Sequence, residues 1–218
     1  MVRADLHLAA WFAALGAAAA LVAPAPAISS QPLEQEALAH ARQIRAEVSA
    51  RYRKPHGARL AVTEASTTDV IDSFTLFTSP LEEPRGVPAV NGIYYAICPV
   101  RATCPYPGRS ARSAAAFVPR REALELAVRT FLETSANLVV VSLPTRRFVL
   151  LVLERDEVMA AVDAPALRDA LSGDPAAAPD PPLRRVVDQL TLQHLFLAWA
   201  LVPISDTRET LFASCLFP

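Results

Sequence analysis

The chain has 218 residues, of which 52% are hydrophobic, and a formal net charge of −1. So small a net charge excludes a general electrostatic attraction to nucleic acid or to anionic membranes. Nucleic acid is therefore not an expected partner. At this length the folded part of the chain is most simply one domain with a sizeable core.

The N-terminus has the three parts of a secretory signal. Met1–His7 is short and polar with a positive charge at Arg3, Leu8–Ala23 carries no charge, and Ala25–Ala27 is a small-x-small site. We therefore expect a signal peptide over residues 1–27 and an exported domain over 28–218, secreted or in the periplasm or another extracytoplasmic space. The alternative is an uncleaved N-terminal membrane anchor, although a spanning helix needs about 20 apolar residues.

The first half of the exported domain is predicted to contain one helix and three strands. Pro32–Lys54 has apolar residues three or four apart, as on one face of an amphipathic helix. Arg59–Ala65 and Ser73–Thr78 have the alternation and the β-branched or aromatic content of strands. A proline-rich loop, Ser79–Asn91, precedes a third strand at Gly92–Cys98.

The second half begins with a helix that opens at Pro119. Leu138–Leu143 and Phe148–Leu153 are apolar on both alternating faces, so we expect this hairpin in the middle of the sheet with both sides covered. Glu157–Leu171 predicts a weaker helix interrupted at Pro165.

The rest of the chain is predicted to be a linker, a helix and two strands. Ser172–Pro182 is rich in proline and small residues and predicts a flexible surface linker. Leu183–His194 is predicted as a helix, and Leu195–Val202 and Thr210–Leu216 as closing strands. The whole pattern predicts an α+β fold, in which helices pack on a mixed or antiparallel sheet.

Three cysteines are present. Cys98 and Cys104 are six residues apart with Pro99 between them, so in an oxidising compartment we expect a local disulfide. We expect Cys215 to be buried and unpaired. Zinc would need more ligands at tighter spacing.

No catalytic or cofactor-binding motif is present, so no cofactor is expected. Glu36 and His40 stand one helical turn apart and could share a metal, but no third ligand is evident, so we expect no metal site. Asp156 and Glu157 end a predicted strand, where carboxylates serve in glycosidases and other enzymes. The simpler interpretation of this acidic pair is the start of a helix.

The segment 84–121 contains six arginines and no acidic residue. Arginine beside tyrosine in a ring-stiffened loop suits recognition of anionic groups, so Arg101, Arg109, Arg112 and Tyr106 are the candidate ligand-binding residues. The alternative is that this basic segment faces the acidic segment 154–188, or that water solvates both.

Two functional classes follow from these patterns. The favoured one is an exported, non-enzymatic binding or envelope-interaction domain that uses the Cys98–Arg121 segment. Its partner would be an anionic cell-wall polymer, a lipid head group or another protein. The other is a cell-envelope hydrolase whose site combines residues distant in sequence. The absence of catalytic motifs favours the first.

Overall fold

The structure is a computed structural model, and it describes residues 35–52, 60–68, 71–79, 82–99, 110–145, 148–175, 177–205 and 208–215. These residues contain five α-helices and one eight-stranded mixed sheet, which confirms the α+β prediction. They all belong to one compact unit, Gln31–Pro218. None of the helices within these ranges is long and apolar enough to cross a membrane. The predicted signal peptide lies outside the described residues.

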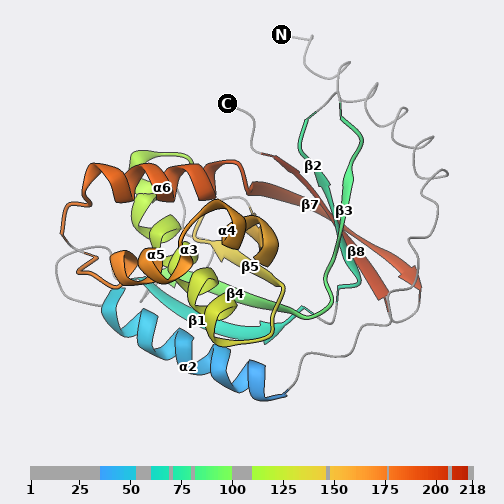
Figure 1. Cartoon of the computed structure of the whole chain (residues 1–218). Helices are drawn as coiled ribbons and strands as arrows, with labels where there is room; N and C mark the ends of the chain where they lie inside the picture. Colours follow the sequence, from blue (N-terminus) through green and yellow to red (C-terminus); the bar gives the residue numbers. More distant parts are fainter. Residues whose placement is uncertain are drawn as a thin grey trace, which may run out of the picture. The chain divides into compact units, whose positions relative to one another are not determined.

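The elements, in chain order (Figure 1), are α2 (Gln35–Tyr52), β1 (Leu60–Thr67), β2 (Ser73–Phe77), β3 (Arg85–Pro88), β4 (Gly92–Pro99), the 3-10 helix η1 (Ala114–Ala116), α3 (Phe117–Glu133), β5 (Leu138–Leu143), β6 (Val149–Glu154), α4 (Arg155–Ala161), α5 (Ala164–Leu171), α6 (Pro181–Leu192), β7 (Leu195–Ser205) and β8 (Arg208–Cys215).

The strand order is β1-β4-β5-β6-β7-β8-β2-β3, with parallel pairs at β4–β5 and β2–β8. Both β1–β4 and β2–β3 are antiparallel, so they are two arms of one long hairpin with a break in the middle. At the break Asn91 has a positive φ of 58°, and a Cβ on Gly92 would stand 2.4 Å from the Thr68 hydroxyl oxygen. This close approach requires glycine at position 92. The break lets one arm join β5 and the other join β8.

Two predictions of sequence reasoning need correction here. The proline-rich segment 79–91 is not entirely loop, because β3 lies within it and pairs with β2. The helix expected to open at Pro119 begins two residues earlier, at Phe117, directly after η1. Proline is still tolerated there, since the first turn of a helix has no internal partner for its backbone N–H groups.

One core lies between the helices and one face of the sheet. Val139, Val141, Leu151 and Leu153 of the central hairpin belong to it, together with the buried stripes of α2 and α3. The stripe of α2 consists of Ala37, Ala41, Ile44, Val48 and Tyr52, as the helical spacing predicts apart from Leu33, which is outside the described residues.

A second core lies on the opposite face of the sheet, where no helix contributes. Val140 and Val152 of the central hairpin pack in one buried cluster with Phe74 of β2, Val87 of β3 and Leu211 of β8. The sheet therefore folds back so that β2, β3 and β8 cover β5 and β6. The prediction that the Leu138–Leu153 hairpin is central and covered on both sides is confirmed.

Candidate functional site

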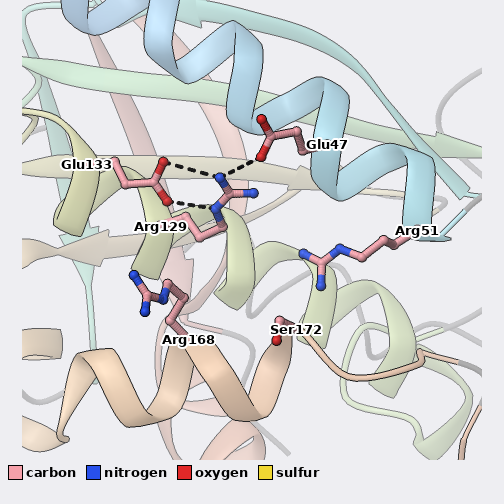
Figure 2. A pocket seen from close by; sticks show the side chains of 6 residues that line it. All are labelled: Glu47, Arg51, Arg129, Glu133, Arg168 and Ser172. Carbon is pink, nitrogen blue, oxygen red and sulfur yellow. Dashed lines mark hydrogen bonds and ion pairs between the residues drawn. The ribbon is translucent and has the colours of Figure 1, made fainter.

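A cavity of about 570 Å³ opens between α2, α3 and α5. It is lined by Glu47, Arg51, Arg129, Glu133, Arg168 and Ser172 (Figure 2). Because α2 and α5 both pack against α3, three segments far apart in sequence bring their charged side chains to one place.

Arg129 neutralises the acidic side of this cavity. Its guanidinium donates to the Glu133 carboxylate at 2.8 and 3.2 Å and to Glu47 at 2.7 Å (Figure 2). These hydrogen bonds raise the pKa of Arg129, and a bond from Gln43 together with Arg129 lowers the pKa of Glu47. The charges of Arg129, Glu47 and Glu133 therefore compensate one another within the cavity wall.

Arg51 connects the cavity to a buried carboxylate. Glu125 is fully buried and pairs with Arg51, and it accepts a hydrogen bond of 3.1 Å from the Tyr52 hydroxyl. Burial lowers the pKa of Arg51, and Arg129 and Arg121 lower it further. An anion that entered beside Arg51 would relieve this repulsion between cations.

Arg168 and Ser172 form the remaining wall. Arg168 donates to Asp169, its exposed neighbour in the chain, at 2.9 and 3.0 Å. Such an exposed pair is weak and is easily exchanged for another anion. Arg51 and Arg168 both line the cavity (Figure 2), so its wall can receive an anionic group.

Of the four arginines of the basic segment 84–121 that the structure describes, Arg85, Arg120 and Arg121 contact the acidic segment 154–188. Arg85 pairs with Glu154 and Glu157 at 2.8 and 3.0 Å. Arg120 is 2% exposed and pairs with Asp188 at 2.6 Å. These contacts make Arg85 and Arg120 internal ties between distant segments.

Arg121 is also internal. It is 3% exposed and donates to the backbone carbonyls of Leu171, Gly173 and Asp174. These carbonyls belong to the end of α5 and to the start of the segment predicted as a linker. Pro181 and Pro182, at the other end of that segment, form the first turn of α6, capped by Asp180.

The predicted ligand-binding loop is described only at its end. Arg101, Tyr106, Arg109 and Cys104 lie outside the described residues, as does the side chain of Cys98, so the disulfide stays a prediction. Arg112 is partly buried, and its guanidinium lies 3.9 Å from the Cys215 sulfur. Cys215 is a free cysteine and is partly rather than fully buried.

The acidic end of β6 lies beside a histidine. The His194 ring nitrogen Nδ1 is 3.7 Å from Glu157, while Asp156 is exposed. Burial lowers the pKa of His194, and burial raises the pKa of Glu154. His40 faces Glu133 at 3.4 Å. Among the residues the structure describes, no group of three potential ligands could hold a metal.

Sequence reasoning missed the cavity, because the side chains that line it come from three helices far apart in the chain. In the structure α3 is covered on nearly all sides, and the carboxylates of Glu122 and Glu125 are fully buried. The available signal was the density of charge on α3, because Arg120, Arg121 and both glutamates fall within six residues.

Comparison with family models, with curated proteins and with solved structures finds no match to this chain. The function of the chain is therefore inferred from the geometry of the cavity and of the sheet.

Proposed function

We propose that this protein is an exported, non-enzymatic binding domain that takes an anionic group in the cavity between α2, α3 and α5. The observation that carries the proposal is the division of charge in the cavity. Arg129 is held by two carboxylates of the cavity wall, Glu47 and Glu133, whereas Arg51 pairs with the buried Glu125 and Arg168 with the exposed Asp169, and both arginines line the open space. Guanidinium groups bind carboxylates and phosphates through paired hydrogen bonds.

The lining favours binding over catalysis. The six side chains are arginines, glutamates and one serine, and the Ser172 hydroxyl donates to the Asp169 carbonyl at 2.7 Å. A nucleophilic serine needs an adjacent base to take its proton. The contacts of Ser172 provide a turn at the end of α5 instead.

The Cys98–Arg121 segment is proposed as a second binding site for an anionic group, through Arg101, Arg109, Arg112 and Tyr106. The partner would be a cell-wall polymer, a lipid head group or a protein, all of which carry phosphate or carboxylate outside the cytoplasm. Arg120 and Arg121 are not part of this contact, because both are buried in internal pairs.

Matched variants of the full chain distinguish the contribution of the cavity from that of the loop. Arg51→Lys combined with Arg168→Gln alters the cavity and leaves a cation opposite Glu125. Arg101→Gln, Arg109→Gln and Arg112→Gln alter the loop, and Arg42→Gln on the exposed surface of α2 is the control. The measurement is retention on poly(glycerol phosphate) and on phosphatidylglycerol vesicles, with phosphatidylcholine vesicles as the uncharged reference.

We expect the cavity variant to reduce retention by about tenfold, since a hydrogen bond to a charged group contributes about 1.5–3 kcal/mol. Retention should also fall as salt is raised, because salt screens exposed charges. Unchanged retention of the cavity variant, with loss in the loop variant, would move the site to the loop. Unchanged retention of both variants would refute the proposal.

Export is tested separately. Intact-mass analysis of protein recovered outside the cytoplasm should find a chain that begins at Ile28. A full-length chain fixed in the membrane would establish the N-terminal anchor instead.

One observation favours the alternative of a cell-envelope hydrolase. Arg85 of β3, Glu154 of β6, Glu157 of α4 and His194 of the turn before β7 meet in one network of charged groups. Release of soluble fragments from labelled cell wall, lost in Glu157→Gln, would support this alternative. Equal release by both proteins, at the level of the buffer blank, would exclude it for this network.

A further inference from the structure

The helices cover only half of one face of the sheet. α2, α3 and α4 pack over β1, β5 and β6, and Figure 1 shows β2, β3, β7 and β8 extending beyond the helices. The pairing registers show that this same face continues from Leu197 across to Phe212, Thr75 and Gly86. No helix in the described ranges belongs to a buried cluster on that part.

Three aromatic rings lie together on the uncovered face. Trp199 stands 5.5 Å from Phe212 and 6.0 Å from Phe77, measured between ring centroids, and Phe77 stands 6.4 Å from Phe212. Trp199 is 48% exposed even though it contacts both phenylalanines. It lies at a register shift between Ala198 and Ala200, and such irregularities re-aim side chains.

Hydroxyl groups surround the aromatic rings, and charge is absent among the described side chains of this face. Ser73 and Thr210 share a hydrogen bond of 3.0 Å, and Thr75 is paired in register with Phe212. Thr210 is only 5% exposed, so the accessible hydroxyls are those of the partly exposed Ser73, Thr75 and Ser214. The described positions on this face are Ser73, Thr75, Phe77, Gly86, Pro88, Trp199, Ala200, Val202, Thr210, Phe212 and Ser214.

We propose that this aromatic face, formed by the positions just named, binds a neutral glycan chain. Sugar rings present flat C–H faces that stack on aromatic rings, and their hydroxyls exchange hydrogen bonds with serine and threonine. The surface is independent of the charged cavity and lies on different elements.

The composition of the face selects against other partners. Single-stranded nucleic acid also stacks on aromatic rings, but its phosphates require a cationic groove, which these side chains do not supply. Peripheral membrane helices combine their apolar residues with lysine and arginine, and neither occurs among the described side chains of this face. Uncharged hydroxyls beside stacked rings match an uncharged, hydroxyl-rich polymer.

The test measures binding of chitohexaose and cellohexaose, two neutral β-linked glycans, to the full chain. Isothermal titration calorimetry measures binding, so that the readout does not depend on Trp199 itself. In the wild type, binding should also shift the tryptophan fluorescence to the blue. Trp199→Ala should weaken binding about tenfold or more, as removal of one stacked ring does for other ligands, and Trp199→Phe should recover part of the loss.

Phe148→Ala is the matched control, because Phe148 is also 48% exposed but belongs to the opposite face of the sheet. It should bind as the wild type does. If Trp199→Ala fails to fold, Thr75→Val decides the question, because it removes one hydroxyl without changing the shape of the side chain. That variant should bind several-fold more weakly, while its melting temperature stays close to that of the wild type.

Three results would overturn the proposal. One is the absence of binding to both glycans at millimolar concentration. Another is an equal loss of binding in Phe148→Ala and Trp199→Ala. The third is concentration-dependent self-association that Trp199→Ala abolishes without any glycan binding, which would make this face an interface between two copies of the chain.

Discussion

The covered and uncovered halves of the sheet use the same backbone pairing but differ in what protects their side chains. In the covered half, ten of the twelve residues of β5 and β6 are buried between the helices and the opposing strands, and Val139 and Leu151 are fully buried. In the uncovered half, Trp199, Leu201 and Ile204 of β7 are each at least 48% exposed.

The two partly buried residues of these strands are Ser142 and Glu154. The covered half is therefore almost entirely closed to solvent, whereas the outer half of β7 is open. The difference indicates that the covered half stabilises the fold and that the uncovered half is free to contact a partner.

The largest difference between the halves should appear when a charge is placed in each. Val140 is 1% exposed in the second core, so Val140→Asp should cost about 4 kcal/mol or more and prevent folding. Val202 is 42% exposed, and Val202→Asp should change stability by less than about 1 kcal/mol. Urea unfolding of both variants checks this. A Val140→Asp variant that melts close to the wild type would contradict our assignment of the core.

A smaller difference in stability should distinguish substitutions of the buried and the partly exposed arginines of the basic segment. Arg120 holds Asp188 of α6 and two backbone carbonyls, so Arg120→Gln should destabilise the protein by about 2 kcal/mol or more. Arg112→Gln, in the same segment, should change stability by about 0.5 kcal/mol. Thermal unfolding of the two variants measures the difference. Equal effects would show that burial does not distinguish these arginines.

Cys98, one of the two cysteines of the predicted disulfide, lies near the end of β4 in the covered half of the sheet. Closure of a short loop by this disulfide should contribute about 2 kcal/mol, which Cys104→Ser would remove. Peptide mapping without reduction should find Cys98 and Cys104 in one linked fragment. A bridge from Cys215 to either of them would contradict the local pairing.

The smallest expected effect is a dependence of stability on pH at the junction of the two halves. His194 directly precedes β7 and faces Glu157 of α4 and Arg85 of β3. Burial lowers its folded-state pKa below the ordinary value near 6.5. Between the lowered pKa of the folded state and the ordinary value near 6.5, the unfolded state binds more protons than the folded state. The free energy of unfolding should therefore fall as the pH drops below about 6.5.

His194→Gln should remove this part of the pH dependence. Melting temperatures measured from about pH 8 to about pH 5.5 stay above the range in which most carboxyl groups titrate. The wild type should lose more stability than the variant toward the acidic end. Parallel curves for the two proteins would show that His194 does not contribute.

The sequence by itself determined the α+β class and most of the elements. The alternation in Ser73–Thr78 and the two-sided apolar runs of Leu138–Leu153 report local pairing and burial, which neighbouring residues largely decide. The sequence missed β3, because Arg85–Pro88 is short, exposed and flanked by prolines, so its pairing with β2 is the main evidence for it.

Only the tertiary structure decided which charges are internal and which face a cavity. Arg120 and Arg168 look alike in the sequence, yet one is buried against Asp188 and the other lines the space between α3 and α5. The same holds for Trp199, whose strand is as apolar as the central hairpin but extends, beyond Leu197, past the core that the described helices form. Burial depends on contacts between residues far apart in the chain, and local spacing carries no information about those contacts.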